Sequence, residues 1–309
     1  MPKTAAAADR RPILGTGSRN SDLTSVTHAG ISMKRARILR AAVLYSLLIA
    51  GSAVILMPFW WMIATSLKSM DEIMAYPPTF VPKEAFWSNY AHTWNAAPFT
   101  QYTLNTLFLA VSTVAGNVLV NSFVAYGFAK IDFRGKKFWF ALLLATMMIP
   151  GFVTLIPQYI FFSKLNLVGT YYPLILPAFL GNAFFIFLVR QFYMGVPNDL
   201  IEAAKIDGAS HFRIWLQIMI PLAKPALIAV AIFSFNGAWN DFLGPLLYVN
   251  DETLYTLQIG LQTFKTTLTT QWNYLMAGSV LVLLPVIVLF FLMQKYFIEG
   301  MNLQAGTKG

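Results

Sequence analysis

One polar segment of an otherwise apolar chain carries acidic and small residues at helical spacing. It covers residues 195–227 and reads GVPNDLIEAAKIDGASHFRIWLQIMIPLAKPAL. Asp199 is a good helix N-cap and Glu202 follows three residues later, a capping-box pattern that predicts two helical turns over residues 200–207. Gly208 is expected to end these turns, because glycine readily adopts the left-handed conformation. The pattern therefore predicts a short helix with a defined start and end.

This short helix is expected to have one narrow side flanked by carboxylates. Ala203 and Ala204 predict a flat face, and Glu202 and Asp207 place hydrogen-bond acceptors beside it for a basic partner. A small-residue helix with fixed ends suits insertion into a groove. The same residues also fit a membrane-surface helix that only links two spans, and the residues alone leave both interpretations open.

A second short helix is expected directly downstream. Ser210 is a suitable N-cap for residues 211–220. Pro221 and Pro225 are expected to end this helix and to begin the next apolar run. The predicted apolar side consists of Phe212, Trp215, Leu216 and Met219.

Polar and aromatic side chains within the apolar runs are the second group of candidates. Polar groups are costly in a bilayer, so they often mark a solute pathway. The candidate pathway residues are Asn117, Asn121, Asn236, Trp239, Asn240 and Asp241. Asn236 and Asn240 are one helical turn apart and share a face. The alternative is hydrogen bonding between helices, which is the more common explanation of a buried asparagine.

The sequence offers no constellation for catalysis or metal binding. It has no cysteine, which excludes disulfides and thiolate ligands, and its three histidines lie far apart. The phosphate-binding pattern G-x-x-x-x-G-K-[ST] is missing, as is any Ser-His-Asp or paired-carboxylate arrangement. We therefore expect no catalytic residue, no metal and no cofactor on this chain, so that any use of ATP would belong to another polypeptide.

The elements that must position these residues are helices in a lipid bilayer. Of the 309 residues, 57% are hydrophobic and 11% are charged, whereas a soluble domain carries about 25% charged residues. A bilayer core needs about 20 apolar residues of helix. Six runs qualify, at residues 39–66, 103–128, 138–162, 171–192, 225–248 and 275–297. Several contain Pro, Gly or Asn, which neighbouring helices must cover, so an all-α bundle of six transmembrane helices is predicted.

Lysine and arginine concentrate in alternate connections, which predicts the orientation of the chain. They cluster in the first 37 residues, in residues 130–137 and in residues 195–224. Both termini and the Glu202 segment are therefore expected in the cytoplasm of a multi-pass cell-membrane protein. The net charge of +9 is interpreted as this membrane signal and not as a nucleic-acid-binding surface. Residues 68–102 and 249–273 are expected to form ordered external surfaces.

The polar segment and several spans resemble a known family. The segment contains EAAKIDGAS followed by IPLAKPAL, which is similar to the EAA loop of ABC importer permeases. The matching positions are Glu202, Ala203, Ala204, Asp207, Gly208 and Pro221. Three further stretches look like the maltose-type, MalG-like sugar permeases: MIPGFVTLIPQYIFFSKLNLVGTYYPLIL, AWNDFLGPLLY and MQKYFIEGMNLQAGTKG. The resemblance covers nearly the whole chain from Leu39, and the extension before about residue 34 departs from it.

This resemblance implies a type I, MetI-like permease that works with several other chains. The EAA loop would be a coupling helix that docks in a cleft of an ATPase subunit. The implied partners are a second, MalF-like permease, two copies of a MalK- or MsmX-like ATPase that use ATP and Mg²⁺, and an extracytoplasmic solute-binding protein. The chain would form half of the translocation pathway for a mono- or oligosaccharide, with glycerol 3-phosphate or another small polar solute as the alternative.

The predicted domain organisation has three parts. Residues 1–37 are expected to form a disordered, basic cytoplasmic tail. Residues 38–298 are expected to form the six-helix domain, which includes the cytoplasmic coupling loop 195–224. Residues 299–309 would be a cytoplasmic tail, whose closing Gly-Thr-Lys-Gly resembles a family feature that reaches toward the ATPase dimer.

Overall fold

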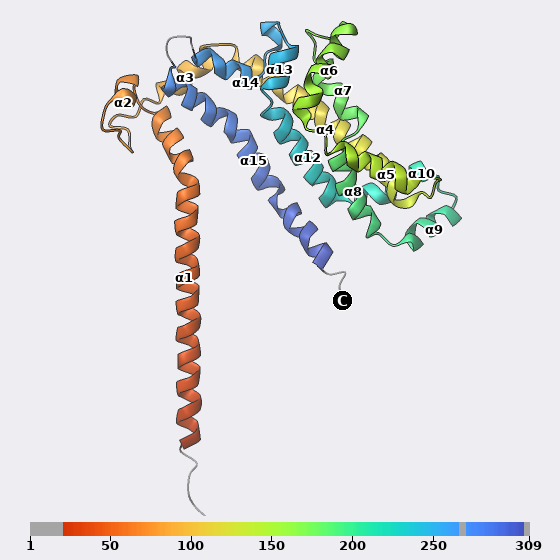
Figure 1. Cartoon of the computed structure of the whole chain (residues 1–309). Coiled ribbons are helices and arrows are strands. Elements are labelled where there is room, and N and C mark those ends of the chain that lie inside the picture. The colour runs from red at the N-terminus through yellow and green to blue at the C-terminus, as the bar shows by residue number, and fades with distance from the viewer. Residues whose placement is uncertain (1–20, 266–269, 306–309) are drawn as a thin grey trace, which may run out of the picture. The chain divides into compact units, whose positions relative to one another are not determined.

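The structure is a computed structural model that describes residues 21–265 and 270–305, and these residues are predominantly helical (Figure 1). Residues 1–60 form one unit and residues 61–309 another. Helix α1 (Ser21–Ser66) begins upstream of residue 37, and α15 (Trp272–Ala305) continues past residue 299. The Gly-Thr-Lys-Gly at residues 306–309 lies outside the described residues.

Among the described residues, four helical stretches are long and apolar enough to cross a bilayer. They are Arg37–Ser66, α4 (Phe99–Lys130), Tyr172–Met194 and Trp272–Lys295. Two bent helix pairs also qualify: α5 (Lys136–Thr146) with α6 (Gly151–Lys164), and His211–Leu222 with α12 (Lys224–Trp239). Six spans result when each bent pair counts as one, so the prediction of an all-α, six-span protein is confirmed.

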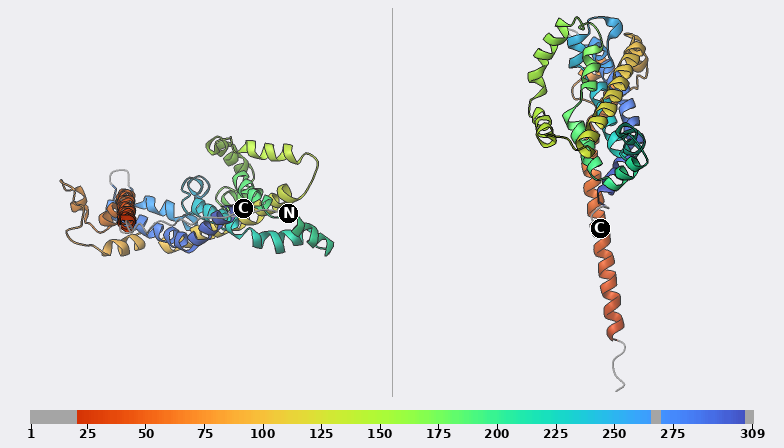
Figure 2. Two further views of the ribbon diagram at one scale, coloured as in Figure 1. Left: turned by 90° about the horizontal axis from the view of Figure 1, so that it is seen from below. Right: turned by 90° about the vertical axis from the view of Figure 1, so that its right-hand side faces the viewer.

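The third predicted span, residues 138–162, is bent. Its halves, α5 and α6, meet at 94° (Figure 2). Pro150 precedes α6 in an extended conformation, with φ −62° and ψ 134°. Proline has no N–H to donate and disfavours helical geometry in the residue before it, so it accounts for the interruption.

The helix of the fifth predicted span, residues 225–248, is shorter than predicted. Its helix α12 ends at Trp239, and a separate short helix α13 (Leu243–Tyr248) follows. A bend of 83° lies at the start of α12, where this helix meets His211–Leu222. Pro221 and Pro225 flank this bend, and neither can donate a backbone hydrogen bond to continue the helix.

The fourth span is interrupted between α7 (Tyr172–Leu180) and α8 (Ala183–Met194). Gly181 has φ +98°, and Asn182 restarts the helix by accepting hydrogen bonds from the backbone N–H groups of Phe184 and Phe185 at 3.0 and 3.2 Å. The side-chain oxygen of Asn121 in α4 accepts the Asn182 backbone N–H at 2.6 Å. A neighbouring helix thus satisfies the backbone at this break, as an apolar environment requires.

Helix α4 is the central packing element, in contact with α7, α8 and α12. Its Gly116 permits one of these close approaches, because an added Cβ would lie 2.7 Å from Cδ2 of Phe179 in α7. Close backbone approach at small residues is typical of helix packing in membranes. The α4 side chains Phe99 and Tyr126 belong to separate hydrophobic clusters near opposite ends of the helix.

The two ends of α4 contact different connections. Near its start, the side-chain amide of Asn105 donates to the carbonyl oxygens of Thr253 and Tyr255 at 2.8 and 2.9 Å. At its end, Lys130 contacts the segment that leads into α9 (Asn198–Ile206). The connections that the charge pattern assigned to opposite sides of a membrane therefore lie at opposite ends of α4.

Candidate functional site

Helix α9 contains the residues of the EAA pattern. It begins at Asn198 after Pro197, and Asp207 follows its last residue, Ile206. Gly208 has φ +79°, as predicted, and the Ala209 N–H donates to the carbonyl of Ala204 at 2.9 Å. The prediction of an Asp199 N-cap is wrong, because Pro197 begins the helix earlier and no side chain caps it. Asp199 instead lies in the first turn, where a negative charge is favourable.

The two alanines of α9 face in different directions. Ala204 is 9% exposed and packs with Ile201 in the hydrophobic core, whereas Ala203 is exposed. The predicted flat Ala203–Ala204 face is therefore wrong, since successive helical residues are about 100° apart. Glu202 and Asp207 are exposed, and Ile206 exposes 87% of its surface. The outer side of α9 thus combines a small residue, a large apolar side chain and two carboxylates.

Two side chains of α4 hold the chain on both sides of α9. The Lys130 ammonium donates to the carbonyl of Val196 and to the side-chain oxygen of Asn198, the latter at 2.7 Å. One turn earlier, the Tyr126 hydroxyl and His211 Nδ1 share a hydrogen bond of 2.8 Å. Sequence reasoning counted Lys130 only as a topology signal. Its role in holding α9 depends on a contact between residues far apart in the sequence.

The helix after α9 has an irregular turn. Ser210 caps α10 (His211–Ile214) by accepting the Arg213 N–H at 3.3 Å, as predicted. A π-helix follows over Trp215–Met219, and α11 (Ile220–Leu222) contains Pro221 in its first turn. The wider π turn changes the register of the apolar side. The buried side chains are Ile214, Trp215 and Met219, whereas Phe212 and Leu216 are exposed, so the predicted apolar side is only half right.

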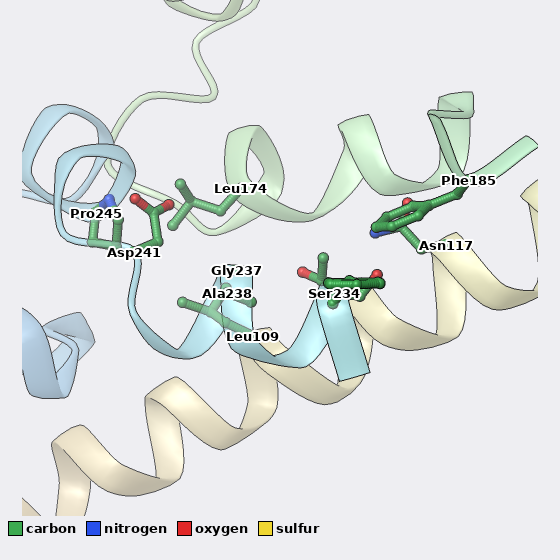
Figure 3. Close-up of a pocket in the computed structure, with 11 residues that line it drawn as sticks. Leu109, Asn117, Leu174, Phe185, Ser234, Gly237, Ala238, Asp241 and Pro245 are labelled. Atoms are coloured by element: carbon green, nitrogen blue, oxygen red, sulfur yellow. The ribbon is translucent and has the colours of Figure 1, made fainter. Parts of the chain in front are cut away.

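A cavity of about 270 Å³ lies among α4, α7, α8, α12 and α13. Two of the predicted pathway residues, Asn117 and Asp241, line it. Figure 3 shows the Asp241 carboxylate near Leu174 and Pro245 at one end, and Asn117 beside Phe185 at the other. The cavity therefore combines polar groups with apolar and aromatic walls, which is the usual composition of a small-molecule site.

The other candidate pathway residues do not line this cavity. The Asn121 side chain bonds to Asn117 and to the break before α8, which is the helix-packing alternative. Trp239 is buried, and its indole N–H donates to the carbonyl of Val282 in α15 at 3.0 Å. Asn236 and Asn240 are exposed and bond to each other at 2.9 Å.

Sequence reasoning missed two polar residues of the cavity, Thr113 and Ser234. Ser234 lies on α12, and Figure 3 shows its side chain between the two ends of the cavity. Its hydroxyl is buried and has no hydrogen-bond partner among the described residues. A serine within an apolar run could have been noted from the sequence, but the lack of a partner is visible only in the fold.

A family model described as the binding-protein-dependent transport system inner membrane component matches residues 117–302. The chain is 33% identical over 244 residues to the probable ABC transporter permease protein YurM of Bacillus subtilis, with 79% of this chain and 81% of the relative covered. It is 34% identical to the arabinooligosaccharides transport system permease protein AraQ of Halalkalibacterium halodurans, with coverages of 82% and 91%.

Another relative is the sn-glycerol-3-phosphate transport system permease protein UgpE of Yersinia pestis, 33% identical with coverages of 82% and 93%. Among solved structures, a bacterial ABC transporter involved in the import of the acidic polysaccharide alginate matches with a TM-score of 0.73 and 23% identity. It covers 92% of this chain and 100% of its own, and shows a shared fold. The family model covers more than half of the chain and these relatives most of it, so the chain belongs to the binding-protein-dependent transport system inner membrane components.

Proposed function

We propose that this chain is the permease subunit of an ATP-driven importer, and that its solute is a mono- or oligosaccharide. The observation that carries this proposal is α9, an exposed helix of the EAA pattern that α4 holds on both sides. The AraQ relatives are named for arabinooligosaccharides, which supports a carbohydrate. Glycerol 3-phosphate is the second candidate solute, because the UgpE relatives are similarly identical to this chain.

In this proposal α9 docks on a separate ATPase subunit, which binds ATP and Mg²⁺. Ala203 allows close approach, Ile206 fills an apolar part of the ATPase groove, and the Glu202 and Asp207 carboxylates accept hydrogen bonds from basic side chains. Gly208 sets the direction in which the chain leaves α9, and Pro221 flanks the bend that leads into α12. In this proposal docking would bury the Ile206 side chain, which is 87% exposed in this subunit.

The complete importer would contain two permeases, two ATPases and a solute-binding protein. We place α9 and both termini in the cytoplasm, in agreement with the lysine and arginine pattern. The binding protein would contact the opposite end of the bundle, to which the described residues 68–102, 249–265 and 270–273 belong. Parts of the second segment are well fixed for this purpose, because Asn105 bonds to Thr253 and Tyr255, and Phe264 packs against Phe99.

Helix α4 gives this subunit a direct mechanical connection between α9 and the cavity. Its last turns hold the α9 segment through Tyr126 and Lys130, and the same helix carries Asn117 into the cavity. When two ATPases close on ATP, a rigid-body movement of α9 would move α4 with it and change the shape of the cavity. Rigid packed elements with two arrangements are the usual carriers of such coupling.

The test is solute uptake by the purified complex reconstituted in proteoliposomes, with both permeases, the ATPases and the solute-binding protein. We expect uptake of a labelled arabinooligosaccharide that requires ATP and the binding protein. Uptake of glycerol 3-phosphate alone would favour the second candidate solute. Uptake that continues without the ATPase subunits would refute the proposed importer mechanism.

A further inference from the structure

The cavity among α4, α7, α8, α12 and α13 contains a single ionisable side chain. Of the 11 residues that line it, Asp241 is the one that can carry a charge, and none is Lys, Arg or His. The Asp241 carboxylate accepts the backbone N–H of Gly244 at 3.0 Å. Burial disfavours the ionised form of this carboxylate, and the hydrogen bond from Gly244 offsets part of that effect. This subunit therefore contributes one acidic group to the cavity and no basic group.

Gly244 also determines where the Asp241 carboxylate lies. A Cβ atom at position 244 would lie 2.4 Å from Oδ2 of Asp241 and 2.9 Å from Cδ2 of Leu174. Only a residue without a side chain leaves room for the carboxylate in its present place. The position of the charge at the cavity wall is thus built into the first turn of α13.

A second observation points to a ligand in the same cavity. Ser234 lines the cavity and is 5% exposed, but its hydroxyl oxygen is itself buried and has no hydrogen-bond partner in the described part of the chain. A ligand would bind this hydroxyl after a χ1 rotation that turns it toward the cavity. Buried hydroxyl groups are nearly always paired with protein, water or ligand. Asn117 supplies a further polar side chain, and Phe185 and Phe233 supply aromatic walls. Hydrogen-bonding groups between aromatic walls suit a compound with several hydroxyl groups and apolar ring faces.

We propose that this cavity is a subsite for a neutral, polyhydroxylated solute, in which Asp241, Ser234 and Asn117 bind hydroxyl groups and Asp241 rejects phosphate esters and other anions. A carboxylate forms strong hydrogen bonds with hydroxyl donors. The same carboxylate repels an anion, and the repulsion is large where water is scarce. This inference rests on the proposed function and, within it, selects a carbohydrate over glycerol 3-phosphate.

The chain has no cysteine, which allows a direct measurement of charge in the cavity. Gly237 lines the cavity, and an added Cβ meets no atom within 4 Å, so Gly237→Cys should be tolerated. In the purified full complex, modification of this cysteine is timed with a cationic (trimethylammonioethyl) and an anionic (sulfonatoethyl) methanethiosulfonate. The ratio of the two rates is divided by the ratio for the same chain unfolded in detergent. We expect the cationic reagent to be favoured by about tenfold or more.

Three second-site variants connect this preference to Asp241. Asp241→Asn keeps the oxygen that accepts the Gly244 N–H but removes the charge, and should abolish the preference. Gly244→Ala should reduce it by displacing the carboxylate. The matched control is Glu84→Gln, the same change of charge at an exposed residue outside the cavity, and it should leave the preference intact. An unchanged preference in Asp241→Asn would overturn the inference.

Uptake by the unmodified complex separates this inference from the proposed function. Transport of glycerol 3-phosphate would overturn the inference and leave an ATP-driven importer in place. Carbohydrate uptake without any Asp241-dependent charge preference would also overturn it, while the proposed function stands. Carbohydrate uptake together with an Asp241-dependent preference would support both.

Discussion

The adjacent residues Ala203 and Ala204 show that the role of a side chain depends on its surroundings as well as on its type. The sequence assigns both to the EAA pattern, and both are small. In the structure Ala204 packs in the core and Ala203 faces outward. A large side chain should therefore impair the permease at both positions, but for a different physical reason at each.

We predict that Ala203→Trp blocks docking and that Ala204→Trp disrupts packing. At position 203 the indole projects from α9 into the space that the ATPase would occupy, so the permease should reach the membrane normally but lose most of its bound ATPase. At position 204 it must enter a filled core, at a cost of about 1–3 kcal/mol or more. Membrane abundance and ATPase co-purification distinguish the two outcomes. Ala203→Ser is the control, and retention of ATPase by Ala203→Trp would contradict the docking assignment.

Two glycines with positive φ, Gly208 and Gly169, allow a second prediction. Gly208 and Gly169 have φ of +79° and +88°, and an added Cβ meets no atom within 4 Å at either. Valine at either position should therefore cost a similar strain, about 1–3 kcal/mol. Only Gly208→Val should abolish transport per molecule of permease, because it alone distorts the end of α9. Normal transport by both variants, after normalisation to permease abundance, would show that transport does not depend on the geometry of α9.

Residue type alone could predict part of the candidate site. Asn121 and Asp241 were equally polar candidates in apolar runs, and only the structure shows that Asn121 caps a break in another helix while Asp241 faces a cavity. Gly208 was predictable, because its conformation is a local property of a helix end. Partners that lie far apart in the sequence, such as Lys130 and Asn198, were not.

At the scale of elements, apolar length predicted where helices run but not how they bend. Pro150, Pro221 and Pro225 mark both bends, yet a proline in a membrane span can also be accommodated within a helix. The π-helix at Trp215–Met219 has no local signal of this kind. It depends on which side chains the core accepts, so periodicity placed Phe212 and Leu216 inside where the structure exposes them.

The contact between α4 and α9 leads to a prediction about the coupling of ATP hydrolysis to transport. Lys130→Ala removes the donor that holds the carbonyl of Val196 and the side chain of Asn198. Helix α9 should still form and bind ATPase, but its movement would reach α4 less directly. We expect ATP hydrolysis to persist while solute imported per ATP falls about threefold or more. The coupling ratio in proteoliposomes measures this effect directly.

The matched control for Lys130 is Lys136→Ala. Lys136 is also a basic residue near the end of α4, but among the described residues its side chain pairs with Asp132, at 3.3 Å, and not with the α9 segment. An exposed ion pair of this kind, outside a helix, contributes little to stability because water screens it. Lys136→Ala should therefore leave the coupling ratio unchanged. If both variants reduce the ratio equally, general loss of positive charge and not the α9 contact would be the cause.

At the scale of the whole molecule, the charge pattern and the fold agree on which connections belong together. Residues 130–137 and the start of α9 meet at one end of α4. The segment around Thr253 and Tyr255 meets the other end, where Tyr171 also donates its hydroxyl to the carbonyl of Leu254 at 2.8 Å. All connections at one end of α4 must lie on the same side of the membrane. Locating one connection at each end therefore determines the orientation of the others.

We predict that the α9 end is cytoplasmic, and two cysteines introduced into this cysteine-free chain can test it. Asp207 and Glu84 are both exposed acidic residues, Asp207 at the end of α9 and Glu84 between α2 (Met70–Met74) and α3 (Ser88–Asn95). In intact cells without the ATPase subunits, an impermeant maleimide should label Glu84→Cys and not Asp207→Cys. Both should react after the membrane is permeabilised, which shows that each thiol is accessible. Labelling of Asp207→Cys in intact cells would reverse the orientation and place α9 where no ATPase can reach it.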